Sequence, residues 1–162
     1  MAQVDFFLKI DGWDGESPDE KHSKEIEVKS WSVGVAQSGS SDRGGGAGTG
    51  KALFQDISFT KIFDAASPNL LTGCASGEHK TKAVLVCRKA GKDQQEYLKV
   101  TLSDVIVSHY QTQGSEGSGG ALHDSFSLNY SKIEFEYKAQ KADGTLGGAV
   151  KKSYDLKANK AA

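Results

Sequence analysis

Hydrophobic and polar residues alternate along most of this 162-residue chain, a pattern typical of β-strands that bury one face. Runs rich in β-branched and aromatic residues are separated by Gly, Asp, Asn or Ser. Seven such runs predict seven long strands, at 4–10, 25–35, 53–60, 82–89, 96–110, 125–140 and 150–158. The chain is therefore predicted to be mainly β.

Two of these runs change the parity of their apolar positions. Apolar residues occupy even positions up to Val28 and odd positions from Trp31 onward, and the same change occurs between Tyr130 and Ile133. Because successive side chains point to opposite faces, each change requires a bulge or bend that lets one strand serve two sheets. Long bent strands predict a β-barrel of two bent antiparallel sheets, closed or nearly closed.

One segment, 64–79, has the signals of a short α-helix instead. Ser67 is the expected N-cap, Pro68 stands in the first turn, and Gly77 is the expected stop. Its apolar face is predicted to consist of Leu70, Leu71 and Cys74. We expect this helix to flank the barrel and cover one end of it.

Composition and charge narrow the function. The chain has no internal repeat and no segment long enough to be a domain linker, so residues 1–162 are predicted to form a single domain. Twenty basic and 21 acidic side chains give a net charge of -1, without the basic excess that binding nucleic acid requires. Acids are concentrated in residues 1–28 and lysines in 138–162. These are either ordinary solvated faces or two complementary surfaces that meet in an assembly.

Targeting and redox features are few. No basic segment followed by a long apolar run begins the chain, and no run approaches the ~18 apolar residues of a membrane span. We therefore expect synthesis in the cytoplasm, no membrane insertion, and export, if any, without a cleaved signal peptide. Cys74 and Cys87 stand among apolar residues and are predicted to be free thiols that pack as small hydrophobes.

The segment "GGAGTGKA" resembles a phosphate-binding loop. Gly45, Gly50 and Lys51 match its pattern, but Ala52 stands where a hydroxyl should bind magnesium. Such a loop must lead into a helix whose N-terminus faces the phosphates, whereas this one leads into a predicted strand. We expect no nucleotide site here.

The pattern of residues does not support a metal site or a catalytic site either. The four histidines have neither the i, i+4 spacing nor the cysteine neighbours of a zinc site: His22, His79, His109 and His123. No nucleophile motif with partnered His and Asp is present. No metal, cofactor or catalytic residue is predicted, and the chain is not expected to be an enzyme.

Three motifs carry a resemblance to a known family. They are G-E-S-x-D-x-x-H at 15–22, S-W-S at 30–32 and S-F-T-K-x-x-D-x-x-S-P at 58–68. With the segments 96–108 and 128–148, they make the chain similar over essentially its whole length to the haemolysin-coregulated protein family, the inner-tube subunits of bacterial type VI secretion systems.

The resemblance implies a β-barrel with a flanking helix, six copies of which form a homohexameric ring. Rings stack into a tube that a contractile sheath propels from a baseplate, behind a spike, toward a target cell. The lumen carries and protects effector proteins. Assembly in the cytoplasm and secretion through the apparatus are therefore expected.

The resemblance also assigns candidate residues. In the family, the loop after the second strand reaches the neighbouring ring, and the matching residues here are Ser38, Asp42, Arg43, Gly44, Gly45, Gly46, Gly48 and Gly50. The second strand borders the lumen, where Ser30, Ser32 and Gly34 are small residues that leave room for a guest. The alternative is that small residues only permit close packing against a neighbouring strand.

A second function from a different class fits the same strand pattern. A monomeric β-barrel that binds carbohydrate or peptide is expected to remain a monomer and to display an exposed aromatic platform. The structure and comparisons with relatives bear on this choice.

Overall fold

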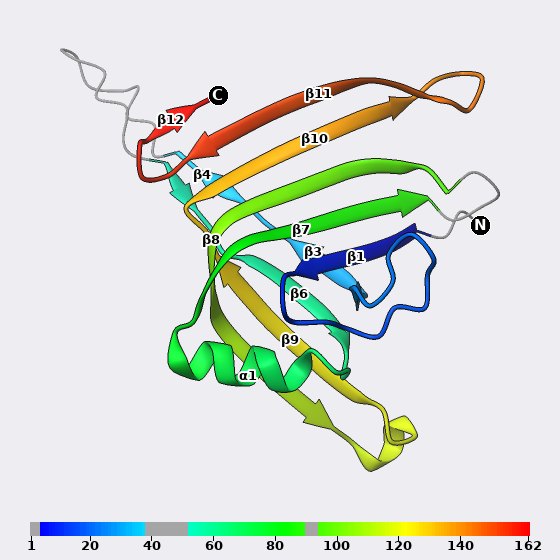
Figure 1. Ribbon diagram of the computed structural model, residues 1–162, viewed down its shortest axis with the longest axis vertical. Helices are drawn as coiled ribbons and strands as arrows, with labels where there is room; N and C mark the ends of the chain where they lie inside the picture. The colour runs from blue at the N-terminus through cyan, green and yellow to red at the C-terminus, as the bar shows by residue number, and fades with distance from the viewer. Residues whose placement is uncertain (1–3, 38–51, 90–93) are drawn as a thin grey trace.

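A computed structural model of the chain describes residues 4–37, 52–89 and 94–162 (Figure 1). The strands are β1 (Val4–Ile10), β2 (Ile26–Val28), β3 (Ser30–Ser32), β4 (Val35–Ala36), β5 (Leu53–Phe54), β6 (Ile57–Ile62), β7 (His79–Lys89), β8 (Glu96–Gly114), β9 (Leu122–Asn129), β10 (Lys132–Gln140), β11 (Leu146–Asp155) and β12 (Lys160–Ala161). One α-helix, α1 (Ser67–Ser76), and one 3-10 turn, η1 (Glu116–Ser118), complete the described part.

The strands form two sheets that share β8, and the paired strands are antiparallel throughout. The first sheet has the order β12-β11-β10-β8-β7-β1-β2, and the second has the order β3-β6-β9-β8. A separate small ladder joins β4 to β5. In Figure 1 the first sheet lies above and the second runs down from it, with β8 curving from one into the other. The prediction of a mainly β fold with two bent antiparallel sheets is confirmed.

The parity change near Tyr130 marks a real bend. The run 125–140 divides there into β9 and β10, which pair with successive parts of β8, and the register shifts between Val107 and His109. Tyr130 is buried, and its hydroxyl donates to the carbonyl oxygen of Gln55 at 2.8 Å. The residue at the bend is thus held by an interior hydrogen bond.

The parity change after Val28 has the same cause. Lys29 separates β2, which pairs with β1, from β3, which pairs with β6, and the Lys29 amide donates to the Thr60 carbonyl at 2.8 Å. The hydrogen-bonded strands do not form one closed barrel, because their order runs from β12 to β2 and the strands β9, β6 and β3 branch from it at β8. The prediction allowed a closed or nearly closed barrel, and the described strands are not fully closed.

Inward side chains of both sheets form one core. Its fully buried members include Leu8, Ile26, Ile57, Phe59, Leu85, Val100, Leu102, Phe126 and Leu128. The rings of Phe59 and Phe126 stack with centroids 4.9 Å apart. Burying each such side chain contributes about 1.5–3 kcal/mol, so this alternating set is the main force that holds the sheets together.

Helix α1 packs along β8 on one side of this core, as the flanking helix was expected to do (Figure 1). Gly77 ends it with a left-handed φ of 67°, which places the amides of Gly77 and Glu78 on the carbonyls of Cys74 and Gly73. Gly73 faces Trp13 so closely that a Cβ would lie 2.4 Å from the indole. The helix therefore depends on a glycine for its packing as well as for its end.

Two details of the predicted helix are wrong. The N-cap is Ala66 rather than Ser67, because the Ser67 hydroxyl is used in a buried polar network described below. Leu71 is 55% exposed and does not share the buried face of Leu70. Cys74 is half-buried and Cys87 is buried, both as free thiols, as predicted.

Candidate interaction surfaces

The outward face of the sheet β3-β6-β9-β8 carries short hydroxyl side chains and amides. The strand register aligns them in two rows, Ser30–Thr60–Ser125–Gln111 and Ser32–Ser58–Ser127–His109. We call these eight residues the hydroxyl face. None of them is a carboxylate or an ammonium.

Cross-strand hydrogen bonds keep the hydroxyl face flat. Ser30 Oγ lies 2.5 Å from Thr60 Oγ1, and Ser58 Oγ lies 2.9 Å from Ser127 Oγ. Hydroxyls that bond to each other lie close to the sheet. The face contains an open depression of about 260 Å³, and a second of about 290 Å³ begins at Thr60, Ser125 and Gln111. It offers donors and acceptors over a broad area rather than a deep binding cavity.

Two of the predicted lumen residues belong to this face. Ser30 and Ser32 are exposed on it, whereas Trp31 points inward, paired with Phe59 and edge-on to Phe6 at 6.4 Å. The alternating faces of β3 are as the sequence predicts. Whether this face borders a lumen stays a prediction.

Gly34 has a different environment. It follows β3, its carbonyl accepts from the Gln55 amide at 2.9 Å, and a Cβ there would lie 3.0 Å from Gln55 Oε1. The atom that a Cβ would meet is the end of the flexible Gln55 side chain, so the lumen role of Gly34 stays a prediction. The predicted stacking residues, Ser38, Asp42, Arg43, Gly44, Gly45, Gly46, Gly48 and Gly50, lie outside the described residues.

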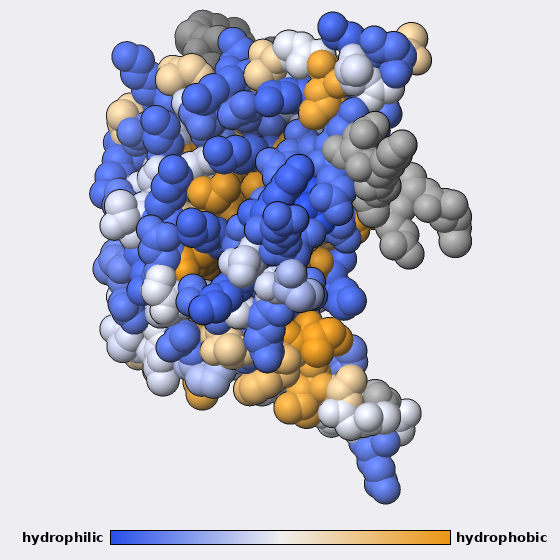
Figure 2. Space-filling model, turned by 45° about the vertical axis from the view of Figure 1, so that its right-hand side comes forward, coloured by the Kyte–Doolittle hydropathy of each residue, from blue (hydrophilic) through white to orange (hydrophobic). Residues whose placement is uncertain are grey.

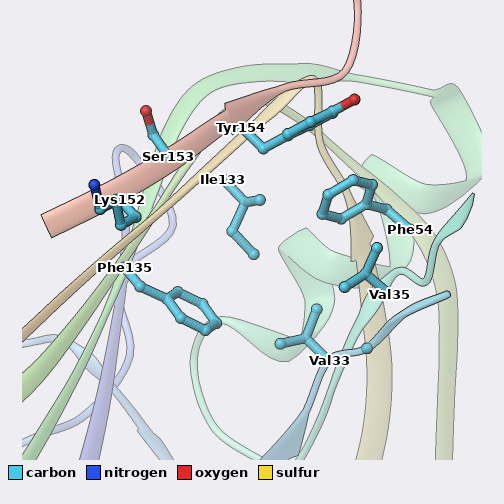
Figure 3. A pocket seen from close by; sticks show the side chains of 9 residues that line it. Val33, Val35, Phe54, Ile133, Phe135, Lys152, Ser153 and Tyr154 are labelled. Atoms are coloured by element: carbon cyan, nitrogen blue, oxygen red, sulfur yellow. The ribbon is translucent and has the colours of Figure 1, made fainter. Parts of the chain in front are cut away.

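An apolar pocket of about 280 Å³ lies where the two sheets diverge (Figure 3). Its lining residues are Val33, Gly34, Val35, Phe54, Ile133, Phe135, Lys152, Ser153 and Tyr154. In Figure 3, Val33, Val35 and Phe54 face Ile133, Phe135 and Tyr154 across the opening, with Lys152 at its edge. The sequence assigned Val33 and Val35 to a buried face, but Val35 is 59% exposed.

A second apolar area lies at the other end of β6. Ile62, Phe63 and Leu122 are each about two-fifths exposed, at 39%, 38% and 42%, and the Phe63 amide donates to the Leu122 carbonyl at 3.0 Å. Figure 2 shows apolar side chains gathered beside the protruding β8–β9 hairpin, where Leu122 begins β9. Strand alternation alone did not reveal this area.

The motif at 58–68 builds a buried polar network. Lys61 Nζ donates to Asp124 Oδ2 at 2.8 Å, to Asp64 Oδ1 at 2.8 Å and to Ser67 Oγ at 2.7 Å. Ser67 in turn donates to Asp124. Burial alone would raise the pKa of Asp124, but the hydrogen bonds from Lys61 and Ser67 hold it below its ordinary value. The network ties α1 to β6 and β9.

Ser67 and Lys61 lie side by side, as a nucleophile and a base would. The Ser67 hydroxyl, however, is completely buried and already donates to a carboxylate. A nucleophile would need access to its substrate and a free base. We assign the pair to the framework of the fold.

The motif at 15–22 builds a second network, which fixes the irregular segment between β1 and β2. Arg88 NH2 donates to Asp19 Oδ2 at 2.6 Å and to Asp5 Oδ2 at 3.2 Å. The hydrogen bond from Arg88 lowers the pKa of Asp19 to about 2. The Arg88 guanidinium also lies over one face of Phe7, with 4.8 Å to the ring centroid.

His22 completes this network on the same aromatic ring. It stacks on Phe7 with ring centroids 4.3 Å apart, and its two nitrogens lie 2.9 Å from Glu25 Oε2 and 2.7 Å from Glu96 Oε1. The motif histidine is therefore held in place by aromatic stacking and by two carboxylates. Among residues 4–37, 52–89 and 94–162, no group of three or more potential metal ligands comes together. No helix in these ranges is long and apolar enough to cross a membrane.

Comparisons with known proteins identify relatives over nearly the whole chain. Residues 7–137 match the family described as "Type VI secretion system effector, Hcp". The chain is 46% identical over 158 residues to "Protein hcp1" of Pseudomonas aeruginosa, covering 96% of this chain and 97% of the relative. It is similar to the crystal structure of Hcp1 from Salmonella typhimurium, with a TM-score of 0.83, 41% identity and full coverage of both chains. A type six secretion system protein matches with a TM-score of 0.92, 29% identity and coverage of 99% and 100%.

Proposed function

The chain belongs to the Hcp family of type VI secretion proteins, and from this premise we propose that it is a structural subunit of the secretion tube. Six copies form a closed ring, rings stack into a tube, and the lumen of the tube carries and protects effector proteins. The observation that carries the proposal is the hydroxyl face, an uncharged, shallow surface on an otherwise charged molecule.

The chemistry of the hydroxyl face suits a lumen that holds cargo for a limited time. Short hydroxyls offer hydrogen bonds in many directions, so no single cargo shape is required. The absence of carboxylates and ammoniums among these eight residues avoids selecting cargo by the sign of its charge. The tight Ser30–Thr60 and Ser58–Ser127 pairs also leave the face smooth, which favours release.

Export follows from the same proposal. A 64-residue stretch, 38% of this chain, is 36% identical to a Pseudomonas aeruginosa relative named "Major exported protein". We infer that this chain assembles in the cytoplasm with sheath, spike and baseplate components and is then secreted through the apparatus. Nucleic acid has no place in this function, since the net charge of -1 lacks a basic excess.

The competing function is a monomeric module that binds carbohydrate or peptide. The aromatic pocket formed by Phe54, Phe135 and Tyr154 is the observation that favours it. Ring formation separates the two functions, because a binding module has no need of a second copy.

Native mass spectrometry of the purified full chain, with negative-stain microscopy, tests the proposal. We expect a mass of six copies and annular particles at micromolar concentration. A chain that stays monomeric under these conditions would contradict the tube function and favour the binding module.

A further inference from the structure

Two groups of exposed or half-buried apolar residues stand out in the described ranges, while Val4, Leu53, Leu71, Tyr137 and Val150 are exposed outside them. The pocket patch is Val33, Val35, Phe54, Phe135 and Tyr154, and the corner patch is Ile62, Phe63 and Leu122. Exposed apolar clusters on a folded protein usually mark contact surfaces. Both patches are partly hollowed, since Ile62 and Phe63 line a depression of about 250 Å³.

The two patches lie at opposite ends of β6. Phe54 comes just before this strand and Phe63 just after it, and a six-residue strand spans about 20 Å. A copy that presents its corner patch to the pocket patch of the next copy would therefore repeat along the direction of β6. This is the geometry of a head-to-tail contact, in which each copy uses two different surfaces.

The two patches at the ends of β6 also differ in the charged residues around them. Lys152 lines the pocket patch, whereas Lys151 beside it on β11 pairs with Glu134; Glu16 and Glu27 flank the corner patch. Lys29 also borders the corner patch, and Asp64 there is already paired with Lys61. One lysine therefore edges the pocket patch, and two glutamates with one lysine edge the corner patch.

We propose that the corner patch of one copy packs against the pocket patch of a second copy, with Phe63 at the opening of the pocket and Glu27 facing Lys152. A contact of the pocket patch with itself would oppose two Lys152 side chains and leave the corner patch exposed. The inference depends on the proposed tube function and deepens it. It places this contact between stacked rings, because β4 and β5, which border the pocket, flank the predicted stacking residues.

Cysteine cross-linking tests the contact. Val35→Cys and Phe63→Cys are made separately in a Cys74→Ser background; burial raises the pKa of the Cys87 thiol to about 11 and keeps it unreactive. Mixed and oxidised with copper phenanthroline, the two variants should form a covalent dimer that neither forms alone. Cross-linking of the Val35→Cys variant with itself, or no cross-link in samples whose rings stack, would overturn the inference.

Charge reversal gives an independent readout. Lys152→Glu and Glu27→Lys should each reduce the fraction of rings that sediment as tubes, and the double variant should restore it because the charges face each other again. Leu71→Ser, at an exposed apolar site outside both patches, should leave sedimentation unchanged. If the double variant is no better than either single one, the pairing is wrong. If wild-type chains form no ring at all, the tube function itself fails, which native mass spectrometry shows separately.

Discussion

The ammonium of Lys61 lies 2.8 Å from the carboxylate of Asp124, and both side chains are completely buried. These residues stand 63 positions apart, on β6 and β9, and Ser67 at the start of α1 bonds to both. One buried ion pair therefore joins two strands of the second sheet to the helix.

Lys61→Met should destabilise the fold strongly. It leaves Asp124 as an uncompensated buried charge, and breaking such a pair typically costs about 3–5 kcal/mol. Chemical denaturation of the purified variant measures this cost. Lys61→Met combined with Asp124→Leu removes both charges and should recover most of the loss; a double variant as unstable as the single one would show that the pair itself, rather than the orphaned charge, holds the fold.

Acid should weaken the loop network through Asp19. Its pKa is lowered from 3.8 to about 2, so the ionised, Arg88-bound form contributes stability above pH 4. That contribution is lost as the pH falls from about 4 through 2, because the carboxyl gains a proton in the unfolded chain first. Melting temperatures measured across this range should fall less steeply in Asp19→Asn than in the wild type.

Asp14→Asn is the matched control for the acid experiment. Asp14 is exposed in the same irregular segment and makes no hydrogen bond or ion pair that joins it to Arg88. Its substitution should leave the acid dependence unchanged. If both variants reduce the dependence of the melting temperature on pH equally, the total charge of the segment sets that dependence, and the contact with Arg88 does not.

Strand alternation predicted most of the fold, because its period of two depends only on which face of each run is buried. The bends after Val28 and at Tyr130 were predictable for the same reason. The Ser67 cap was not, because its hydroxyl bonds to Asp124, a residue 57 positions away. The pocket patch could not be predicted from the sequence either, because the exposure of Val35 depends on how β4 and β5 lie opposite β10 and β11.

Gly73→Ala should loosen the attachment of α1. An added Cβ would lie 2.4 Å from the Trp13 indole, which is buried and cannot move freely. Overpacking of this kind costs about 1–3 kcal/mol, measured as a lowered midpoint of chemical denaturation. Gly148→Ala, on β11 with no atom within 4 Å of the added Cβ, is the control and should be neutral or slightly stabilising.

Ser32→Gln tests the proposed lumen role of the hydroxyl face. Ser32 is exposed beside Ser58, so a longer uncharged side chain should change the stability by no more than about 0.5 kcal/mol. If effectors contact this face, the added bulk fills the shallow depression and displaces them. The expected result is intact rings that no longer co-purify with a cognate effector.

The control for Ser32 is its inward-facing neighbour. Trp31→Ala removes an aromatic side chain that contacts Phe6 and the core, which should cost about 3 kcal/mol, at the low end for such truncations because Trp31 is only half-buried. Comparing the two variants separates loss of cargo from loss of fold, since a melting temperature reports the second alone. Rings of Ser32→Gln that keep the wild-type amount of effector would refute the lumen role of this face, because the substitution would then alter the surface without touching the cargo.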